Sequence, residues 1–226
     1  MHRVFDSPRD SFIFDTGHQS YVHKLLTGRK DFSRLRQKDG IAGYPQRAES
    51  EHDIVESSHA SSSLSWADGI AKAYRLTGQN DRYVVALIGD GALTGGMAWE
   101  ALNNISHDND RKLVIIVNDN GRSYAPTIGG FASNLNNIRT EQTYRRLYRL
   151  SKKFFYRFGL PGRMLWSAVR GAGKGIFGSV TPKSMFPNLD LKYIGPIDGH
   201  DYAQVEQALR QAKKYAHPVI VHMITQ

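Results

Sequence analysis

Two short groups of polar residues could together hold a metal ion. Gly89–Gly91 and Asn118–Asn120 each follow an apolar run, and Asn120 stands thirty positions after Asp90. In a parallel α/β sheet, ligands bind at the carboxyl ends of the strands, so we expect Asp90 and Asn120 to meet there. Carboxylate and amide oxygens suit Mg²⁺, and a ligand phosphate completes its octahedral shell. A Gly-Asp-Gly turn alone is a weak signal, but the two groups at this spacing predict a site for Mg²⁺ and a phosphate-bearing ligand.

The residues after Asp90 suit the phosphate itself. Gly91 has no β-carbon, so its backbone can approach a ligand closely. A helix is expected to begin near Gly95, and the amide groups at a helix N-terminus attract anions. The predicted site is therefore a metal and a phosphate held together at one edge of a sheet.

The strands that must position this site are visible as four short runs that are uniformly apolar rather than alternating. Such runs are typical of parallel strands buried on both faces. They are Phe12–Phe14, Tyr83–Ile88, Leu113–Val117 and Val219–Ile224. Helices are predicted over Ser63–Thr77, Gly96–Ile105 and Tyr202–Tyr215. The alternation of strand and helix predicts a doubly wound α/β domain, with a mainly parallel sheet and helices on both faces.

Capping signals support the first and last of these helices. Ser62 or Ser63 can cap the first helix, and Gly78 can end it. The last helix begins after Asp201 with Gln204 three residues on, which is the spacing of a capping box. Its apolar side chains at Val205, Ala208, Leu209 and Ala212 form one stripe for packing on the sheet.

Composition narrows the class of protein. The 226 residues are 40% hydrophobic and contain no cysteine, which suits one domain over residues 1–226 and excludes disulfides and thiolate metal sites. No run of about 18 apolar residues could span a membrane, and the N-terminus lacks the apolar stretch of a signal peptide. A cytoplasmic protein is the default expectation.

The net charge of +9 comes from one segment. Residues 139–175 hold ten Lys or Arg and one acid, so the other residues carry twenty groups of each sign. We interpret 139–181 as a flexible basic insertion. Nucleic-acid binding by its interleaved arginines and aromatic residues is the alternative, but the neutral remainder makes a nucleic-acid partner the less favoured prediction.

The paired Asp90 and Asn120 groups resemble the thiamine-diphosphate signature shared by transketolases, 2-oxoacid dehydrogenases and decarboxylases. Longer segments resemble the 1-deoxy-D-xylulose-5-phosphate synthase family in particular. These segments are Asp15–Lys24, Leu26–Arg29, Glu49–Asp53, Ser58–Ser61, Gly89–Asn104, Asn118–Ile128 and Lys192–Asp201. They follow the family's order over nearly the whole chain, apart from the basic segment.

The resemblance implies a thiamine-diphosphate site with Mg²⁺. The metal ligands would be the side chains of Asp90 and Asn120 and the main-chain carbonyl of Arg122. The cofactor would be bound by His18, Ser58, His59, Ala60, Gly91, Ala92 and Asn120. His18 is also the predicted catalytic residue, since it would approach the cofactor or the substrate. Glu49, Glu51 and Asp53 are expected to form surface ion pairs instead.

The reaction implied by the resemblance joins pyruvate with glyceraldehyde 3-phosphate and releases carbon dioxide, as a step towards isoprenoid precursors and thiamine. The full enzyme would be a homodimer and would need a pyrimidine-binding domain, supplied on the same chain or separately. The 226 residues alone are expected to hold only the Mg²⁺-diphosphate site and to be inactive. The alternatives are a fragment of another transketolase-like enzyme, or a non-catalytic remnant that binds a cofactor or nucleic acid.

Overall fold

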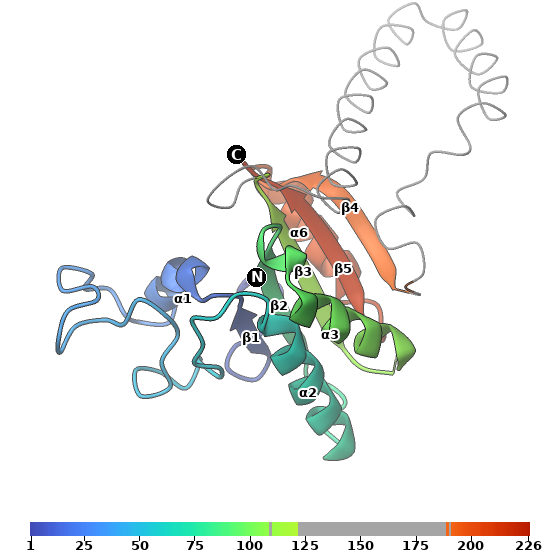
Figure 1. The fold of residues 1–226 in the computed structure, drawn as a ribbon, viewed down its shortest axis with the longest axis horizontal. Coiled ribbons are helices and arrows are strands. Elements are labelled where there is room, and N and C mark those ends of the chain that lie inside the picture. The colour runs from blue at the N-terminus through green and yellow to red at the C-terminus, as the bar shows by residue number, and fades with distance from the viewer. Residues whose placement is uncertain (109, 122–188, 190) are drawn as a thin grey trace, which may run out of the picture. The chain divides into compact units, whose positions relative to one another are not determined.

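A computed structural model describes residues 1–108, 110–121, 189 and 191–226, which belong to one compact unit. Within these residues the chain forms a five-stranded sheet in which every neighbouring pair of strands is parallel. The strand order is β1-β2-β3-β5-β4 (Figure 1). The strands are β1 (Ser11–Phe14), β2 (Val84–Gly89), β3 (Leu113–Asp119), β4 (Lys192–Asp198) and β5 (Val219–Ile224).

The four strands predicted from uniformly apolar runs are confirmed as β1, β2, β3 and β5, the interior of the sheet and one edge. Their residues are almost completely buried. Side chains of a strand alternate between the two faces, so a strand covered on both sides is apolar on both faces rather than at alternate positions. The predicted parallel sheet is therefore correct for a physical reason, the double burial of its strands.

Helices cover both faces of the sheet. The helices are α1 (Tyr21–Leu26), α2 (Ser63–Leu76), α3 (Gly96–His107) and α6 (Tyr202–Ala212), with short 3₁₀ turns η1 (His18–Ser20) and η2 (Ala92–Thr94). α2 packs on β1, β2 and β3 and also on α3, whereas α6 packs on β4 and β5 (Figure 1). The core beneath α6 joins Ala208, Leu209 and Ala212 to strand residues such as Val114 and Val221. The predicted doubly wound arrangement and the apolar stripe of α6 are confirmed.

The edge strand β4 was not predicted from the sequence, because it lacks the continuous apolar run that β1 shows at the other edge. It is only partly buried, and it contains Gly195 and Pro196. Proline cannot donate to a strand ladder and is confined to edges and bulges. The register shifts between Ile194 and Ile197, and Gly195 has a φ of 140° that favours glycine.

The helix ends follow the sequence signals with one exception. Asp201 caps α6, where its carboxylate accepts hydrogen bonds from the amides of Ala203 and Gln204. Gly78 adopts a φ of 75° after α2, as a helix-ending glycine does. Ser62 is the N-cap residue of α2, but its hydroxyl donates to the carbonyl of His59 rather than accepting from the helix. In the part of the chain that the structure describes, no helix is long and apolar enough to cross a membrane.

Candidate functional site

Asp90 follows β2 and Asn120 follows β3. The two strands are hydrogen-bonded to each other, so both residues lie at the carboxyl ends of the strands. Gly89 at the end of β2 lies opposite Asn118 in β3. The amide of Asp90 donates to the carbonyl of Asn118 at 3.2 Å. Asp90 is 2% exposed and Asn120 is exposed. A carboxylate and an amide that follow neighbouring strands are a donor set that suits a hard cation such as Mg²⁺.

The segment after Asp90 enters α3 through the short turn η2. Gly91 has a φ of −62°, so its backbone conformation is open to any residue, and Ala92 begins η2. The N-cap of α3 is Gly95, which makes no side-chain cap hydrogen bond. Because Gly95 has no side chain, it cannot cap the amides in the first turn of α3. Uncapped amides at a helix N-terminus suit the binding of an anion.

The expected cofactor residues Ser58, His59 and Ala60 lie in an exposed stretch that precedes α2. This stretch is joined to the segment after Asp90 through the next residue, because the Ser61 hydroxyl donates to the carbonyl of Ala92 at 2.6 Å. Two loops that are far apart in the sequence are therefore neighbours at the edge of the sheet.

His18 is exposed and begins η1, at the carboxyl end of β1. The preceding Gly17 has a φ of 89°, and a β-carbon there would lie 2.8 Å from Cδ of Pro45 and 3.0 Å from the carbonyl oxygen of Ser57. The turn that carries His18 therefore packs closely against the chain that leads to Ser58. Beyond it, Gln19 Oε1 accepts from Asn118 Nδ2 at 2.8 Å, which joins this turn to β3.

We expect Gly17→Ala to disturb this arrangement far more than Gly28→Ala. Both glycines have a positive φ, of 89° and 98°, so the backbone strain of an alanine is matched. Nothing lies within 4 Å of a β-carbon at Gly28. The extra contact at Gly17 should cost about 1–3 kcal/mol more, as overpacking does. Urea unfolding of both variants measures the difference, and equal free energies of unfolding would show that the close approach is absent.

A buried series of hydrogen bonds supports the turn that carries Asn120. His222 Nε2 lies 3.0 Å from Asp119 Oδ2, and both side chains are fully buried. His222 Nδ1 lies 2.6 Å from the hydroxyl of Tyr193. The other carboxylate oxygen of Asp119 accepts from the amide of Gly121 at 3.0 Å. These hydrogen bonds could not be predicted from the sequence, because only the pairing of β3 with β5 brings His222 to Asp119.

The prediction that Glu49 and Asp53 form surface ion pairs is confirmed for the ion pairs and wrong for their place at the surface. Asp53 has a fully buried side chain that contacts His23 at 3.1 Å and is paired with both terminal nitrogens of Arg29. Glu49 accepts from Lys24, itself fully buried, at 2.6 Å. We call these five residues the ionic cluster. It ties the loop before Ser58 to α1, whereas Glu51 is exposed as expected.

The pairing of Asp53 determines its protonation. Burial alone would raise the pKa of Asp53, but hydrogen bonds from His23, Arg29 and the amide of Gln46, with the charge of Arg29, together hold the pKa well below its usual range. The carboxylate is therefore ionised in the folded protein. Its contribution to stability is complete above the ordinary carboxyl pKa and is lost as the pH falls below that value.

His2 extends the ionic cluster and should give it a pH dependence. Its ring lies 2.9 Å from His23. Burial, followed by repulsion from His23, the N-terminus and His52, lowers the pKa of His2 from 6.5 to about 4. The unfolded chain therefore takes up this proton first, so the stabilisation is complete above pH 6.5 and is lost progressively down to about pH 4. As the pH is lowered over that interval, we expect the free energy of unfolding, measured in urea, to fall less steeply for His2→Gln than for wild type. Identical slopes would contradict the assignment.

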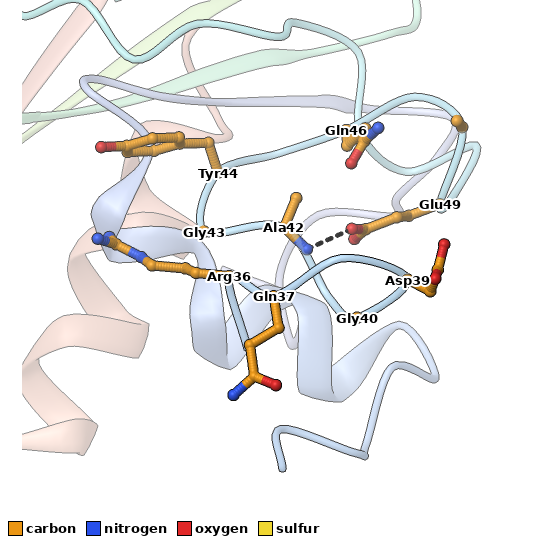
Figure 2. A pocket seen from close by; sticks show the side chains of 10 residues that line it. Arg36, Gln37, Asp39, Gly40, Ala42, Gly43, Tyr44, Gln46 and Glu49 are labelled. Atoms are coloured by element: carbon orange, nitrogen blue, oxygen red, sulfur yellow. Dashed lines mark hydrogen bonds between the residues drawn. The ribbon is translucent and has the colours of Figure 1, made fainter. Parts of the chain in front are cut away.

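An open pocket adjoins the ionic cluster. It has a volume of about 640 Å³ and is formed by residues between Arg36 and Glu49 (Figure 2). Figure 2 shows the amide of Ala42 pointing at the carboxylate of Glu49, to which it donates at 2.6 Å. None of the predicted cofactor residues lines this pocket, although its Tyr44 lies beside Gly17. The pocket is thus separate from the predicted Mg²⁺ site.

Comparison with known proteins decides the family. The family model described as 1-deoxy-D-xylulose-5-phosphate synthase matches residues 1–225. The chain belongs to the 1-deoxy-D-xylulose-5-phosphate synthase family. Synthases named so from Leifsonia xyli subsp. xyli and Clavibacter sepedonicus are each 67% identical over the whole chain, and the one from Corynebacterium jeikeium is 63% identical. The chain spans 35% of the length of the first two relatives and 36% of the third.

The fold of this synthase-family chain also occurs in a solved structure. Transketolase from Leishmania mexicana superposes with a TM-score of 0.60 and 17% identity, over 96% of this chain and 28% of that one. At this identity the likeness concerns the fold alone. It agrees with the parallel, doubly wound sheet described above.

Two predictions for the synthase-family chain fall outside the residues that the structure describes. One is the main-chain carbonyl of Arg122 as a metal ligand, and the other is the flexible basic insertion at 139–181. Among the residues that are described, no group of three or more His, Cys, Asp or Glu side chains could hold a metal. The expected ligand set contains a single carboxylate, from Asp90, and so differs from such a group.

Proposed function

We propose that this chain binds Mg²⁺ and the diphosphate of thiamine diphosphate at the carboxyl edge of its sheet. The observation that carries the proposal is the pairing of β2 with β3, which sets Gly89 opposite Asn118 and so brings Asp90 and Asn120 to one edge. Asp90 and Asn120 would bind the metal through side-chain oxygens, and Arg122 through its main-chain carbonyl. The match to the synthase family supports this cofactor for the chain.

The remaining proposed residues lie on loops that would surround the Mg²⁺ ligands Asp90 and Asn120. Gly91 and Ala92 would contact the diphosphate directly after Asp90, at the entry to α3. Ser58, His59 and Ala60 would line the cofactor from the loop before α2, which Ser61 joins to Ala92. His18, exposed at the end of β1, would approach the cofactor or the substrate. His18 is the proposed catalytic residue within this chain.

For the whole protein we propose a thiamine-diphosphate-dependent transferase that condenses pyruvate with glyceraldehyde 3-phosphate and releases carbon dioxide. When bound, the cofactor supplies a nucleophilic carbon and an electron sink for the loss of carbon dioxide. The chain's own contribution is to anchor the charged end of the cofactor, so that its reactive end has a fixed position. We further propose a homodimer, in which a pyrimidine-binding domain completes the site.

Calorimetric titration of the chain with thiamine diphosphate tests the binding proposal. We expect heat of binding in the presence of Mg²⁺ and its loss in a chelator, because Asp90 and Asn120 would hold the diphosphate through the metal. Thiamine without the diphosphate is the matched control and should bind weakly under both conditions. Equal binding of the two ligands, or binding that is indifferent to Mg²⁺, would refute the proposed site.

An assay of the whole protein separates this reaction from that of other transketolase-like enzymes. With glyceraldehyde 3-phosphate as acceptor, pyruvate should serve as the two-carbon donor and a ketose phosphate should not. The opposite preference would overturn the proposed substrates while leaving the cofactor site in place.

A further inference from the structure

We infer that Asp15 and Ser61 are positioning residues that join three loops of the cofactor site into one unit. The three loops carry His18, Ser58–Ala60 and Gly91–Ala92. The inference rests on the proposed function for the meaning of these loops. The hydrogen bonds that join them are properties of the chain itself.

Asp15 connects the first loop to the second. It is 1% exposed, at the carboxyl end of β1, three residues before His18. Its Oδ1 accepts from the amide of Ser61 at 2.9 Å, and its Oδ2 accepts from the amide of Ser63 at 3.1 Å. A carboxylate at the N-terminus of α2 is favoured both by these amides and by the helix dipole. β1 therefore holds the loop of Ser58–Ala60 at its end next to α2.

Ser61 connects the second loop to the third. Its amide is held by Asp15, and its hydroxyl donates to the carbonyl of Ala92 at 2.6 Å. Ser61 has a φ of 69°, in the left-handed region that a residue other than glycine rarely adopts. Such a conformation persists where the surrounding structure over-determines it. Here the hydrogen bonds of the Ser61 amide and of its hydroxyl hold the residue in this conformation.

Gly95 shows how closely the second and third loops approach. A β-carbon at Gly95 would lie 2.0 Å from Oγ of Ser61, so the absence of a side chain there makes room for the Ser61 hydroxyl. At the next position, Gly96, nothing lies within 4 Å of a β-carbon. Asp15 and Ser61 are themselves buried, so they act on the site through the backbone that they hold.

Ser61→Ala tests the inference, with Ser63→Ala as its matched control. Both serines are buried, Ser61 just before α2 and Ser63 as its first residue, but the Ser63 hydroxyl has no hydrogen-bond partner within the described part of the chain. Ser63→Ala also keeps the amide that Asp15 accepts. We expect Ser61→Ala to weaken Mg²⁺-dependent binding of thiamine diphosphate about tenfold, the scale of one lost hydrogen bond. Ser63→Ala should change it less than about twofold. Equal dissociation constants for the two variants would overturn the inference.

Amide hydrogen exchange in the cofactor-free chain gives a second readout that does not depend on the proposed function. The amides of Thr94 and Gly95 donate within η2, to Gly91 and Ala92. They should exchange about tenfold faster in Ser61→Ala than in Ser63→Ala, while the amides of β2 exchange equally. Equal rates at Thr94 and Gly95 would overturn the inference. A uniform rise that includes β2 would also overturn it, because it would show general destabilisation.

A pair of glycine variants repeats the comparison from the third loop. Gly95→Ala should weaken Mg²⁺-dependent binding and speed exchange at Thr94, because the new methyl group displaces Ser61, whereas Gly96→Ala should leave both near wild type. If wild type itself binds no thiamine diphosphate, the proposed function fails and the exchange rates still decide the inference. Gly95→Ala that behaves like Gly96→Ala in exchange would contradict it.

Discussion

Asp90→Ala should remove Mg²⁺-dependent binding of thiamine diphosphate almost completely. Asp90 supplies the single carboxylate of the proposed ligand set, and it is buried at the end of β2. Loss of residues that merely orient metal ligands costs 10–100-fold in metal affinity, so loss of a direct ligand should cost about 100-fold or more. Calorimetric titration of the variant with the cofactor and Mg²⁺ measures the effect.

Asp110→Ala is the matched control for this experiment. Asp110 is an exposed carboxylate that lies before the start of β3, at the amino ends of the strands, whereas Asp90 lies at their carboxyl ends. Its removal changes the net charge by the same amount and should leave cofactor affinity within about twofold. An equal loss of affinity in the two variants would mean that charge alone governs binding, and the specific role of Asp90 would be lost.

Asp53→Ala should destabilise the fold more than any other single change in the loop before Ser58. The substitution removes the carboxylate that contacts the buried His23 and pairs with Arg29, whose side chain is 10% exposed and keeps a longer ion pair, of 3.5 Å, with Glu49. Breaking a buried ion pair by removing one partner typically costs 3–5 kcal/mol, so we expect about that loss in the free energy of unfolding at neutral pH. Urea unfolding followed by circular dichroism measures the loss.

Glu51→Ala provides the comparison within the same segment. Glu51 is exposed, and surface substitutions of this kind change stability by less than about 0.5 kcal/mol. A loss in Asp53→Ala no larger than in Glu51→Ala would show that the ionic cluster does not hold the loop. Below the ordinary carboxyl pKa the difference between the variants should shrink, since the wild-type advantage of an ionised Asp53 is lost there.

The interior of the sheet could be predicted from the sequence because burial on both faces leaves a continuous apolar run. β2, β3 and β5 each show such a run. β4 lacks it, since this edge strand is covered less completely than β1 at the other edge and tolerates the Gly195-Pro196 pair. Burial on both faces thus produces a recognisable apolar run, whereas the partial burial of β4 does not.

The candidate site was predictable only in part. The placement of Asp90 and Asn120 followed from the rule that consecutive parallel strands end at one edge. The burial of Asp53 and Lys24 did not follow, because their partners lie more than twenty residues away and are brought together by tertiary contacts. The same holds for Asp15 and Ser61, which are ordinary polar residues in the sequence and become connecting residues only when α2 docks beside β1.

The most direct test of the proposed Mg²⁺ site is a crystal of the chain grown with thiamine diphosphate and Mn²⁺, a substitute for Mg²⁺ that gives an anomalous signal. We expect one anomalous peak at the carboxyl ends of the strands, within coordination distance of Asp90 and Asn120 oxygens and of the diphosphate. A peak elsewhere, or an ordered cofactor whose diphosphate lies away from Asp90, would contradict it.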